Sequence, residues 1–308
     1  MTTTHLALVG PTASGKSQLA QAVAACLDDV EIVSVDSMQV YRGLDLGTAK
    51  PSQEERALVP HHLIDVAAPF EQWSVARFQT AARAAVADVE ARGRRALLVG
   101  GTGLYVQAVV DDLRFPGEDL ELRAELEAWT AEPGGVAAAY AELAELDPPA
   151  ADRIDPHNAR RIVRALEVIR LTGQPFSSFG AGLNQFGPTA FPVRMAGVWL
   201  PRAVVAERIA ARFAGMRRAG LVDEVRRLAA ADGGLSRTAR QAIGYKEVLA
   251  HLEGAEPSLD AALDTAVRRT RSFARRQRMW FRRDPRIRWF AATNPASVGP
   301  ALLASWSR

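Results

Sequence analysis

The sequence is short of cysteine, lysine and long hydrophobic runs. Its 308 residues include one cysteine, so no intrachain disulfide can form, and we expect Cys26 to pack as a small hydrophobic residue in the first helix. No stretch approaches the roughly 20 apolar residues of a membrane span, and the first residues lack the basic and then apolar pattern of a signal peptide. We therefore expect a cytoplasmic protein with no membrane partner.

Charge of each sign is concentrated in a different half of the chain. The net charge is +3, but residues 1–150 contain 11 Lys and Arg against 22 Asp and Glu, whereas residues 151–308 contain 27 against 13. A basic half of this kind favours a polyanionic partner, most simply nucleic acid. Any single arginine of that half is still better explained as part of a solvated helix face.

Lysine is rare enough for each one to be informative. The chain has 35 arginines and only three lysines, at positions 16, 50 and 246. The compact lysine ammonium cannot always be replaced by the planar arginine guanidinium. The three lysines are therefore candidate site residues.

A phosphate-binding loop begins ten residues into the chain. Residues 10–17 read Gly-Pro-Thr-Ala-Ser-Gly-Lys-Ser, between an apolar strand at 6–9 and a helical run at 18–25, which is the context that this motif needs. Its glycines let backbone N–H groups surround a phosphate, the lysine adds charge, and the final serine hydroxyl can hold Mg²⁺. We predict that a diphosphate or polyphosphate is bound by Gly10, Pro11, Thr12, Ala13, Ser14, Gly15, Lys16 and Ser17.

Short apolar runs alternate with helical segments over the first third of the chain. This alternation predicts an α/β fold, with a P-loop NTPase-like parallel sheet flanked by helices. The sequence then has a helical pattern from 116 to 192, a further strand pattern at 192–200, and a basic helical region at its end. We expect a catalytic core of 1–115 and 193–308 with a helical insertion domain of 116–192. Further strands are predicted at 31–36, at 60–66 and from 95 into a glycine-rich turn, and a helix at 74–91 with Ser74 as its cap.

The ends of the predicted strands bring polar residues to one edge of the sheet. The phosphate loop, Asp36 and Thr102 all follow strands, so they can converge where ligands bind in such folds. A nucleoside triphosphatase also needs an acid at the end of a later strand, but the strand at 97–99 ends in two glycines. This weakens an ATPase or kinase interpretation. Asp36 would face an acceptor beyond the phosphates, although a solvated strand end or helix cap is the alternative.

Several linked motifs resemble the bacterial tRNA dimethylallyltransferases. The resemblance spans nearly the whole chain in the order of that family, and all three lysines lie inside the motifs. These are Gly10–Ser17, Ser34–Pro51, Pro60–Asp65, Val99–Tyr105, Arg164–Val168, Ala242–Glu247 and the Arg-Gln-x-x-Trp-Phe-Arg run that begins at Arg276.

The resemblance implies a prenyl transfer to RNA. A dimethylallyl group would pass from dimethylallyl diphosphate to N6 of the adenine at position 37, just 3′ of the anticodon, in tRNAs that read codons beginning with U, and diphosphate would leave. The implied cofactor is Mg²⁺ at Ser17, the partner is the tRNA anticodon stem-loop, and the expected state is a monomer. Asp36 would act as the base, Thr102 would orient the reacting groups, and Lys16 would neutralise the leaving group.

Helix spacing suggests further residues that bind the diphosphate, and the family pattern suggests residues that bind the RNA. Arg208 and Arg212 share a helix face and could clamp the diphosphate, or they could simply be solvated. The insertion would clamp the stem-loop against the core. The implied RNA contacts are Asp36, Ser37, Met38, Gln39, Thr102, Arg123, Arg160, Arg161, Ile162, Val163, Arg164 and Lys246.

Some residues that invite a functional role are better explained structurally. His61 and His62 are adjacent on a strand and point to opposite faces, so they do not easily share a metal ion. Trp280 and Phe281, beside the terminal arginines, are favoured as core contacts of an amphipathic helix.

Three rival functions stay open from the sequence. They are an adenylate isopentenyltransferase that acts on free AMP, a P-loop kinase for a small molecule or nucleotide, and a non-catalytic RNA-binding module. The helical insertion and the basic second half argue against the first, because a nucleotide acceptor needs neither.

Overall fold

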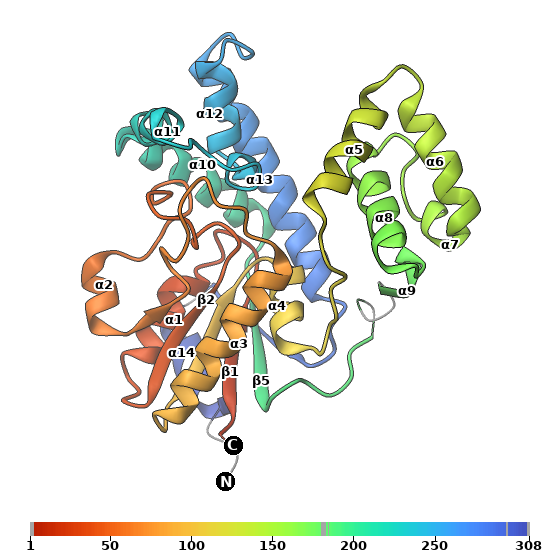
Figure 1. The fold of residues 1–308 in the computed structure, drawn as a ribbon. Helices are drawn as coiled ribbons and strands as arrows, with labels where there is room; N and C mark the ends of the chain where they lie inside the picture. The colour runs from red at the N-terminus through yellow and green to blue at the C-terminus, as the bar shows by residue number, and fades with distance from the viewer. Residues whose placement is uncertain (1–2, 180–182, 184, 294, 307–308) are drawn as a thin grey trace. The chain divides into compact units, whose positions relative to one another are not determined.

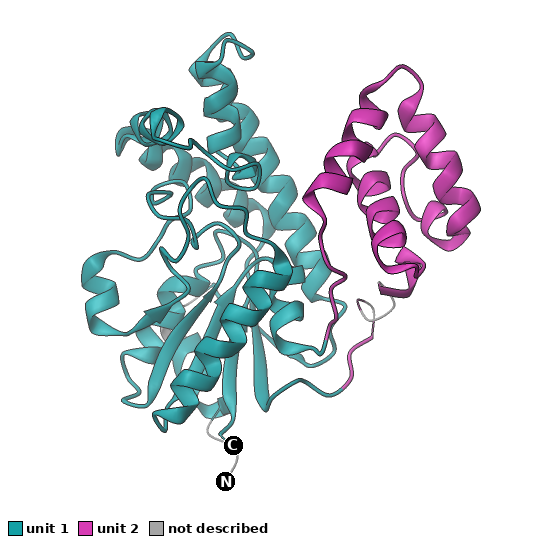
Figure 2. Cartoon of the chain, in the orientation of Figure 1, with its two compact units in different colours: residues 1–112, 188–308 teal, residues 113–187 magenta. Residues whose placement is uncertain are grey.

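The computed structural model describes residues 3–179, 183, 185–293 and 295–306. The chain divides into two compact units, which Figure 2 distinguishes by colour: Met1–Asp112 with Pro188–Arg308, and Leu113–Gly187. Among the described helices, none combines the length and the apolar character needed to cross a bilayer.

A six-stranded sheet forms the centre of the first unit. The strands pair in the order β3-β2-β4-β1-β5-β6, and every pairing is parallel. The central strands are mostly apolar and almost completely buried, as expected for a parallel sheet that is covered on both faces. The predicted parallel α/β sheet is therefore confirmed. The strands are β1 His5–Val9, β2 Val30–Val35, β3 His61–His62, β4 Arg95–Gly100, β5 Val193–Trp199 and β6 Ile287–Ala291.

The sixth strand corrects the expectation that the C-terminal region is helical throughout. β6 lies at the edge of the sheet and pairs with β5. Four of its five residues are apolar, but the strand is short, most of its residues are partly or fully exposed, and it follows directly after the basic end of α13 (Leu259–Phe281).

Helices pack on both faces of this sheet (Figure 1). α3 (Val75–Ala91) packs beside α4 (Gly103–Val110), and α1 (Lys16–Ala24) packs beside α14 (Pro295–Trp306). The basic C-terminal half supplies α13 (Leu259–Phe281), which packs against α10 and α12. The other helices of this unit are α2 Gln53–Leu58, α10 Arg202–Arg218, α11 Leu221–Ala230 and α12 Tyr245–Leu252.

Local signals at helix ends gave one correct and one wrong prediction. Ser74 caps α3, because its side chain accepts the N–H of Arg77 at 3.3 Å. Cys26 does not pack inside the first helix: α1 ends at Ala24, and the cysteine after it is exposed.

The second unit has its own small core. Leu126, Leu143, Ile162 and Leu166 are almost completely buried at the centre of this unit. α5, α6 and α8 supply these side chains and pack against one another. This unit consists of α5 Leu120–Ala131, α6 Gly135–Leu146, α7 Pro148–Ala151, α8 Ala159–Thr172 and α9 Phe176–Phe179.

Candidate active site

The phosphate loop connects β1 to α1 by a turn that only small residues fit. Gly15 has a left-handed backbone with φ of 86°, immediately before α1. A Cβ atom at Gly10 would lie 2.7 Å from the carbonyl oxygen of Val198, so the loop also packs closely against β5. The sequence therefore folds here into a concave backbone at a helix N-terminus, the geometry that receives anionic groups.

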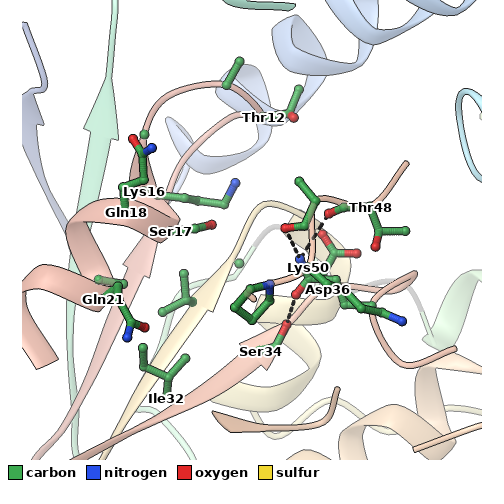
Figure 3. A pocket seen from close by; sticks show the side chains of 18 of the residues that line it. Thr12, Lys16, Ser17, Gln18, Gln21, Ile32, Ser34, Asp36, Thr48 and Lys50 are labelled. Carbon is green, nitrogen blue, oxygen red and sulfur yellow. Dashed lines mark hydrogen bonds between the residues drawn. The ribbon is translucent and has the colours of Figure 1, made fainter. Parts of the chain in front are cut away.

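A cavity of about 510 Å³ lies beside this loop, and Figure 3 shows part of its lining. Lys16 and Ser17 line it from the loop side, and Asp36 lines it from the end of β2. Within the described residues, neither the Lys16 nor the Ser17 side chain has a hydrogen-bond partner. Burial lowers the pKa of Lys16 to about 8, with the attraction of Asp36 opposing this shift and the repulsion of Arg212 adding to it. Among the described residues, no oxygen atom therefore accepts a hydrogen bond from the Lys16 ammonium.

Asp36 is held with one carboxylate oxygen committed to the protein. Oδ1 accepts the backbone N–H of Met38 at 2.9 Å, which fixes the carboxylate after β2 in a tight turn. Among the described residues, Oδ2 has no partner. Such a carboxylate has a free oxygen with which to accept a proton or a hydrogen bond.

Thr102 occupies the N-cap position of α4, yet its side chain makes no capping hydrogen bond. This residue is therefore not a side-chain cap of the helix. It is also not among the residues that line the cavity, which Val99 and Gly100 of β4 line instead.

Arg208 and Arg212 of α10 lie at the phosphate loop and line the cavity. Arg212 donates to Thr12 Oγ1 and to the carbonyl oxygen of Gly47, each at 3.4 Å. A Cβ atom on Gly15 would lie 3.4 Å from Nη1 of Arg208. Both side chains therefore line the cavity beside the predicted phosphate site, Arg208 from an exposed position and Arg212 from a partly buried one.

Lys50, on the opposite wall, is fully engaged. Its ammonium donates to the carbonyl oxygen of Tyr41 at 2.6 Å, to Asp45 at 2.7 Å and to Asp65 at 2.5 Å, and its side chain is only 3% exposed. Burial raises the pKa of Asp65, but hydrogen bonds from Lys50 and Arg56 outweigh it, so this pKa lies below its ordinary value. This lysine therefore connects the segment 41–51, part of which lines the cavity, to Asp65.

Tyr245 and Glu224, to which sequence reasoning gave no role, hold the same segment from the helical side. Glu224 accepts the N–H of Leu46 at 3.0 Å, and the Tyr245 hydroxyl accepts the N–H of Gly47 at 3.2 Å. A Cβ atom at Gly47 would lie 2.1 Å from the Tyr245 ring, so only glycine fits there. Tyr245 lies in a recognised motif, but nothing local indicated its partner.

Gln39 supports this segment through its side-chain amide. Its Oε1 accepts the Ser34 hydroxyl at 2.7 Å, and its Nε2 donates to the carbonyl oxygen of Thr48 at 3.1 Å. The amide is thus already used within the protein, whereas Ser37 and Met38 before it remain partly exposed.

The second unit corrects part of the predicted RNA-binding helix. Ile162 and Val163 are buried in the core of the unit, because they lie on the inner face of α8, so their side chains cannot contact RNA. Arg160 and Arg161, on the same helix, are exposed.

Two other predicted RNA-binding arginines are paired within this unit. Glu167 is completely buried and accepts Nε of Arg123 at 3.0 Å, and it forms an ion pair with Arg164 at 2.9 Å. Arg164 also donates to the carbonyl oxygens of Pro116 and Gly117, each at 3.0 Å. The spacing of Arg164 and Glu167 by three residues was the local signal for this pairing.

The remaining candidates separate into surface and core residues. Lys246 is exposed on α12 and donates to Gln241 at 3.1 Å. Phe281 is 2% exposed, and Trp280 packs so closely that a Cβ atom on Gly103 would lie 2.2 Å from its ring. The prediction that both aromatic residues are core contacts is confirmed.

The two adjacent histidines have separate partners. Nδ1 of His61 lies 2.7 Å from the carbonyl oxygen of Val59, and Nε2 of His62 lies 2.6 Å from Glu31. In the described part of the chain, no cluster of three acidic, histidine or cysteine side chains is arranged to hold a metal ion.

Comparison with known proteins gives consistent matches over the whole chain. The family model described as IPP transferase matches residues 39–284. A tRNA dimethylallyltransferase of Salinispora arenicola is 51% identical, with 98% of this chain and 86% of the relative covered. One of Bifidobacterium animalis subsp. lactis is 48% identical, with coverages of 96% and 85%.

Solved structures agree with these matches. The full-length tRNA isopentenylpyrophosphate transferase of Bacillus halodurans superposes with a TM-score of 0.69 at 39% identity, covering 99% of this chain and 97% of that one. A eukaryotic dimethylallyltransferase, captured while acting on tRNA, gives a TM-score of 0.75 at 26% identity, with coverages of 95% and 75%.

Proposed function

Because the chain belongs to the IPP transferase family, we propose that it transfers a dimethylallyl group from dimethylallyl diphosphate to N6 of the adenine 3′ of the anticodon in tRNA. The observation that carries the mechanism is that one cavity is lined by polar side-chain groups without a hydrogen-bond partner among the described residues. Lys16 and Ser17 lie on one side of it, and the free oxygen of Asp36 lies on the other. A cationic end and a basic end are what this transfer requires.

The phosphate loop binds the leaving group. Backbone N–H groups, the N-terminus of α1 and the Lys16 ammonium surround the diphosphate, and the negative charge that grows on it as the C–O bond breaks is stabilised there. Arg208 and Arg212 add cationic charge from α10. A bound anion also favours the protonated form of Lys16, whose pKa burial lowers.

Asp36 takes the proton from the nucleophile. The adenine amine is a weak nucleophile because its lone pair is delocalised into the ring. As N6 bonds to the first carbon of the dimethylallyl group, the C–O electron pair leaves with the diphosphate and an N6 proton passes to Oδ2 of Asp36. For Thr102 we propose the predicted role of orienting the amine, because its hydroxyl is not used to cap α4 and it follows the cavity-lining Gly100 by two residues.

The residues present fit Mg²⁺ bound mainly through the substrate. Mg²⁺ commonly keeps several waters and binds phosphate oxygens with few protein ligands, and the Ser17 hydroxyl in the cavity is such a ligand. When bound, the ion would neutralise charge on the diphosphate.

The RNA must present its base unstacked, because the reacting amine has to enter the cavity. Ser37 and Met38 lie beside the base-binding end, and the exposed Arg160 and Arg161 of the second unit suit backbone phosphates. We propose that the anticodon stem-loop contacts these residues and that the enzyme acts as a monomer.

The test is transfer of labelled dimethylallyl to an unmodified anticodon stem-loop. Label should appear on RNA with adenine 3′ of the anticodon and not on RNA with guanine there or on free AMP. Asp36→Asn should lower kcat by about 100- to 10,000-fold with little change in RNA affinity. Label on AMP alone, or no label with Mg²⁺ present, would refute the proposal.

A further inference from the structure

Gln277 is a buried polar residue next to the phosphate loop. It lies near the C-terminal end of α13, lines the cavity and is 5% exposed. Its Oε1 accepts the backbone N–H of Thr12 at 2.8 Å. Only the oxygen of a glutamine amide can accept this proton, so the hydrogen bond fixes which way the amide is turned.

The other end of this amide therefore presents its donor group to the cavity. A Cβ atom on Gly101 would lie 2.8 Å from Nε2 of Gln277, 3.1 Å from the carbonyl oxygen of Gly10 and 3.3 Å from Nζ of Lys16, so the two nitrogens lie close together beside the phosphate loop. Within the described residues, Nε2 has no acceptor. This nitrogen is not sealed from solvent, so a ligand can reach it, and a donor close to an ammonium group suits an anionic oxygen.

We infer that Gln277 binds the diphosphate: Nε2 donates to a diphosphate oxygen while Oε1 holds the phosphate loop at Thr12. The inference deepens the proposed function and rests on it for the identity of the ligand. It makes α13 part of the leaving-group site, through a residue that lies 265 positions from the loop it contacts.

A purely structural role would make a different demand on this position. Holding the Thr12 N–H needs only an acceptor, and the carboxylate of a glutamate accepts it at least as well as an amide does. Binding an anion needs the N–H donor, which glutamate lacks. Gln277→Glu therefore separates the two roles with almost no change in size.

The experiment measures the affinity of the full chain for inorganic diphosphate by isothermal titration calorimetry. Loss of a hydrogen bond to a charged group should raise the Kd of Gln277→Glu by about 10- to 100-fold. Gln277→Met, which is neutral and similar in size, should also bind at least about 10-fold more weakly. In the transferase assay, KM for dimethylallyl diphosphate should rise in both variants while KM for RNA stays constant.

Gln18→Glu is the matched control. Gln18 is exposed in the first turn of α1 and belongs to the cavity lining, but Figure 3 shows its amide directed away from Lys16. The variant therefore introduces the same charge beside the loop while the donors of Lys16 and Gln277 stay in place. The Kd of the Gln18→Glu variant for inorganic diphosphate should change by less than about threefold. Equal weakening in Gln18→Glu and Gln277→Glu, or wild-type affinity in either Gln277 variant, would overturn the inference.

Failure of the proposed function would look different. A chain that binds diphosphate through Gln277 but transfers nothing to RNA would refute the transferase and keep the inference. Normal transfer to RNA together with unchanged diphosphate affinity in both Gln277 variants would refute the inference about Gln277 and keep the transferase function. Thermal unfolding of each variant, compared with the wild type, shows whether the fold is intact for these measurements.

Discussion

Lys16 and Lys50 line the same cavity and are used in opposite ways. Lys50 donates three hydrogen bonds, to one carbonyl oxygen and two carboxylates. Lys16 has no hydrogen-bond partner among the described residues, and burial lowers its pKa to about 8. A buried cation with satisfied donors stabilises the fold, whereas one with unsatisfied donors marks where an anion binds.

The neighbours of the two lysines show the same contrast. We call Lys50 and Gln39 the Lys50 wall of the cavity, and Lys16, Ser17 and Gln277 the Lys16 wall. On the Lys50 side, Gln39 is also fully hydrogen-bonded to its neighbours. On the Lys16 side, Ser17 and the Nε2 atom of Gln277 lack partners within the part of the chain that the structure describes. The polar groups on the Lys50 side are therefore satisfied within the protein, whereas the donors on the Lys16 side are left for a ligand.

The largest expected effect comes from removing the unpaired lysine. Lys16→Met should weaken binding of inorganic diphosphate by about 100- to 1,000-fold, because the charge that neutralises the anion is lost. The same change should raise the free energy of unfolding by about 1 kcal/mol, because a desolvated ammonium is removed. Calorimetry and urea unfolding measure the two quantities. A clear loss of stability would show that Lys16 supports the fold after all.

Lys50→Met should show the reverse pattern. Removing the ammonium leaves Asp65 with Arg56 alone and frees the carbonyl oxygen of Tyr41, so the free energy of unfolding should fall by about 2–4 kcal/mol. At a temperature where the variant is folded, its affinity for diphosphate should change by less than about fivefold. A collapse of affinity without a loss of stability would place Lys50 in the binding site and remove the contrast.

The part of the site around Lys16 could be predicted from the sequence where its residues lie close together in the chain. Eight consecutive residues define the phosphate loop, and Asp36 directly follows a strand, so neither needs knowledge of the tertiary fold. Gln277 and Glu224 lie 265 and 178 positions from their partners, and no local pattern encodes such contacts. The sequence marked Lys50 as unusual, but only its three acceptors show that it is structural.

The wrong predictions also have physical causes. Ile162 and Val163 were included with their arginine neighbours because a motif names a stretch of chain, whereas helix geometry separates its faces. β6 was missed because a strand of five residues directly after a long basic helix is too short to stand out from the helical pattern around it.

The smallest expected effect concerns pH and tests the Lys16 wall alone. The pKa of Lys16 in the free folded protein is about 8, below its ordinary value, so the ammonium loses its proton as the pH rises through that value. The bound anion favours the protonated form. Affinity for inorganic diphosphate should therefore fall by about tenfold between pH 7 and pH 9, with proton uptake on binding.

Lys16→Arg supplies the control for this titration, since a guanidinium stays charged over the whole range. Any slope that remains in this variant belongs to the ligand or to other groups. The sign for stability is opposite: above pH 8 the unfolded chain holds the Lys16 proton more tightly than the free native state does, so the wild type should gain stability relative to Lys16→Met as the pH rises. An identical pH dependence of diphosphate affinity in the wild type and Lys16→Arg would mean that the unpaired ammonium keeps an ordinary pKa, and the two walls would then differ in hydrogen bonding but not in the cost of burying their charge.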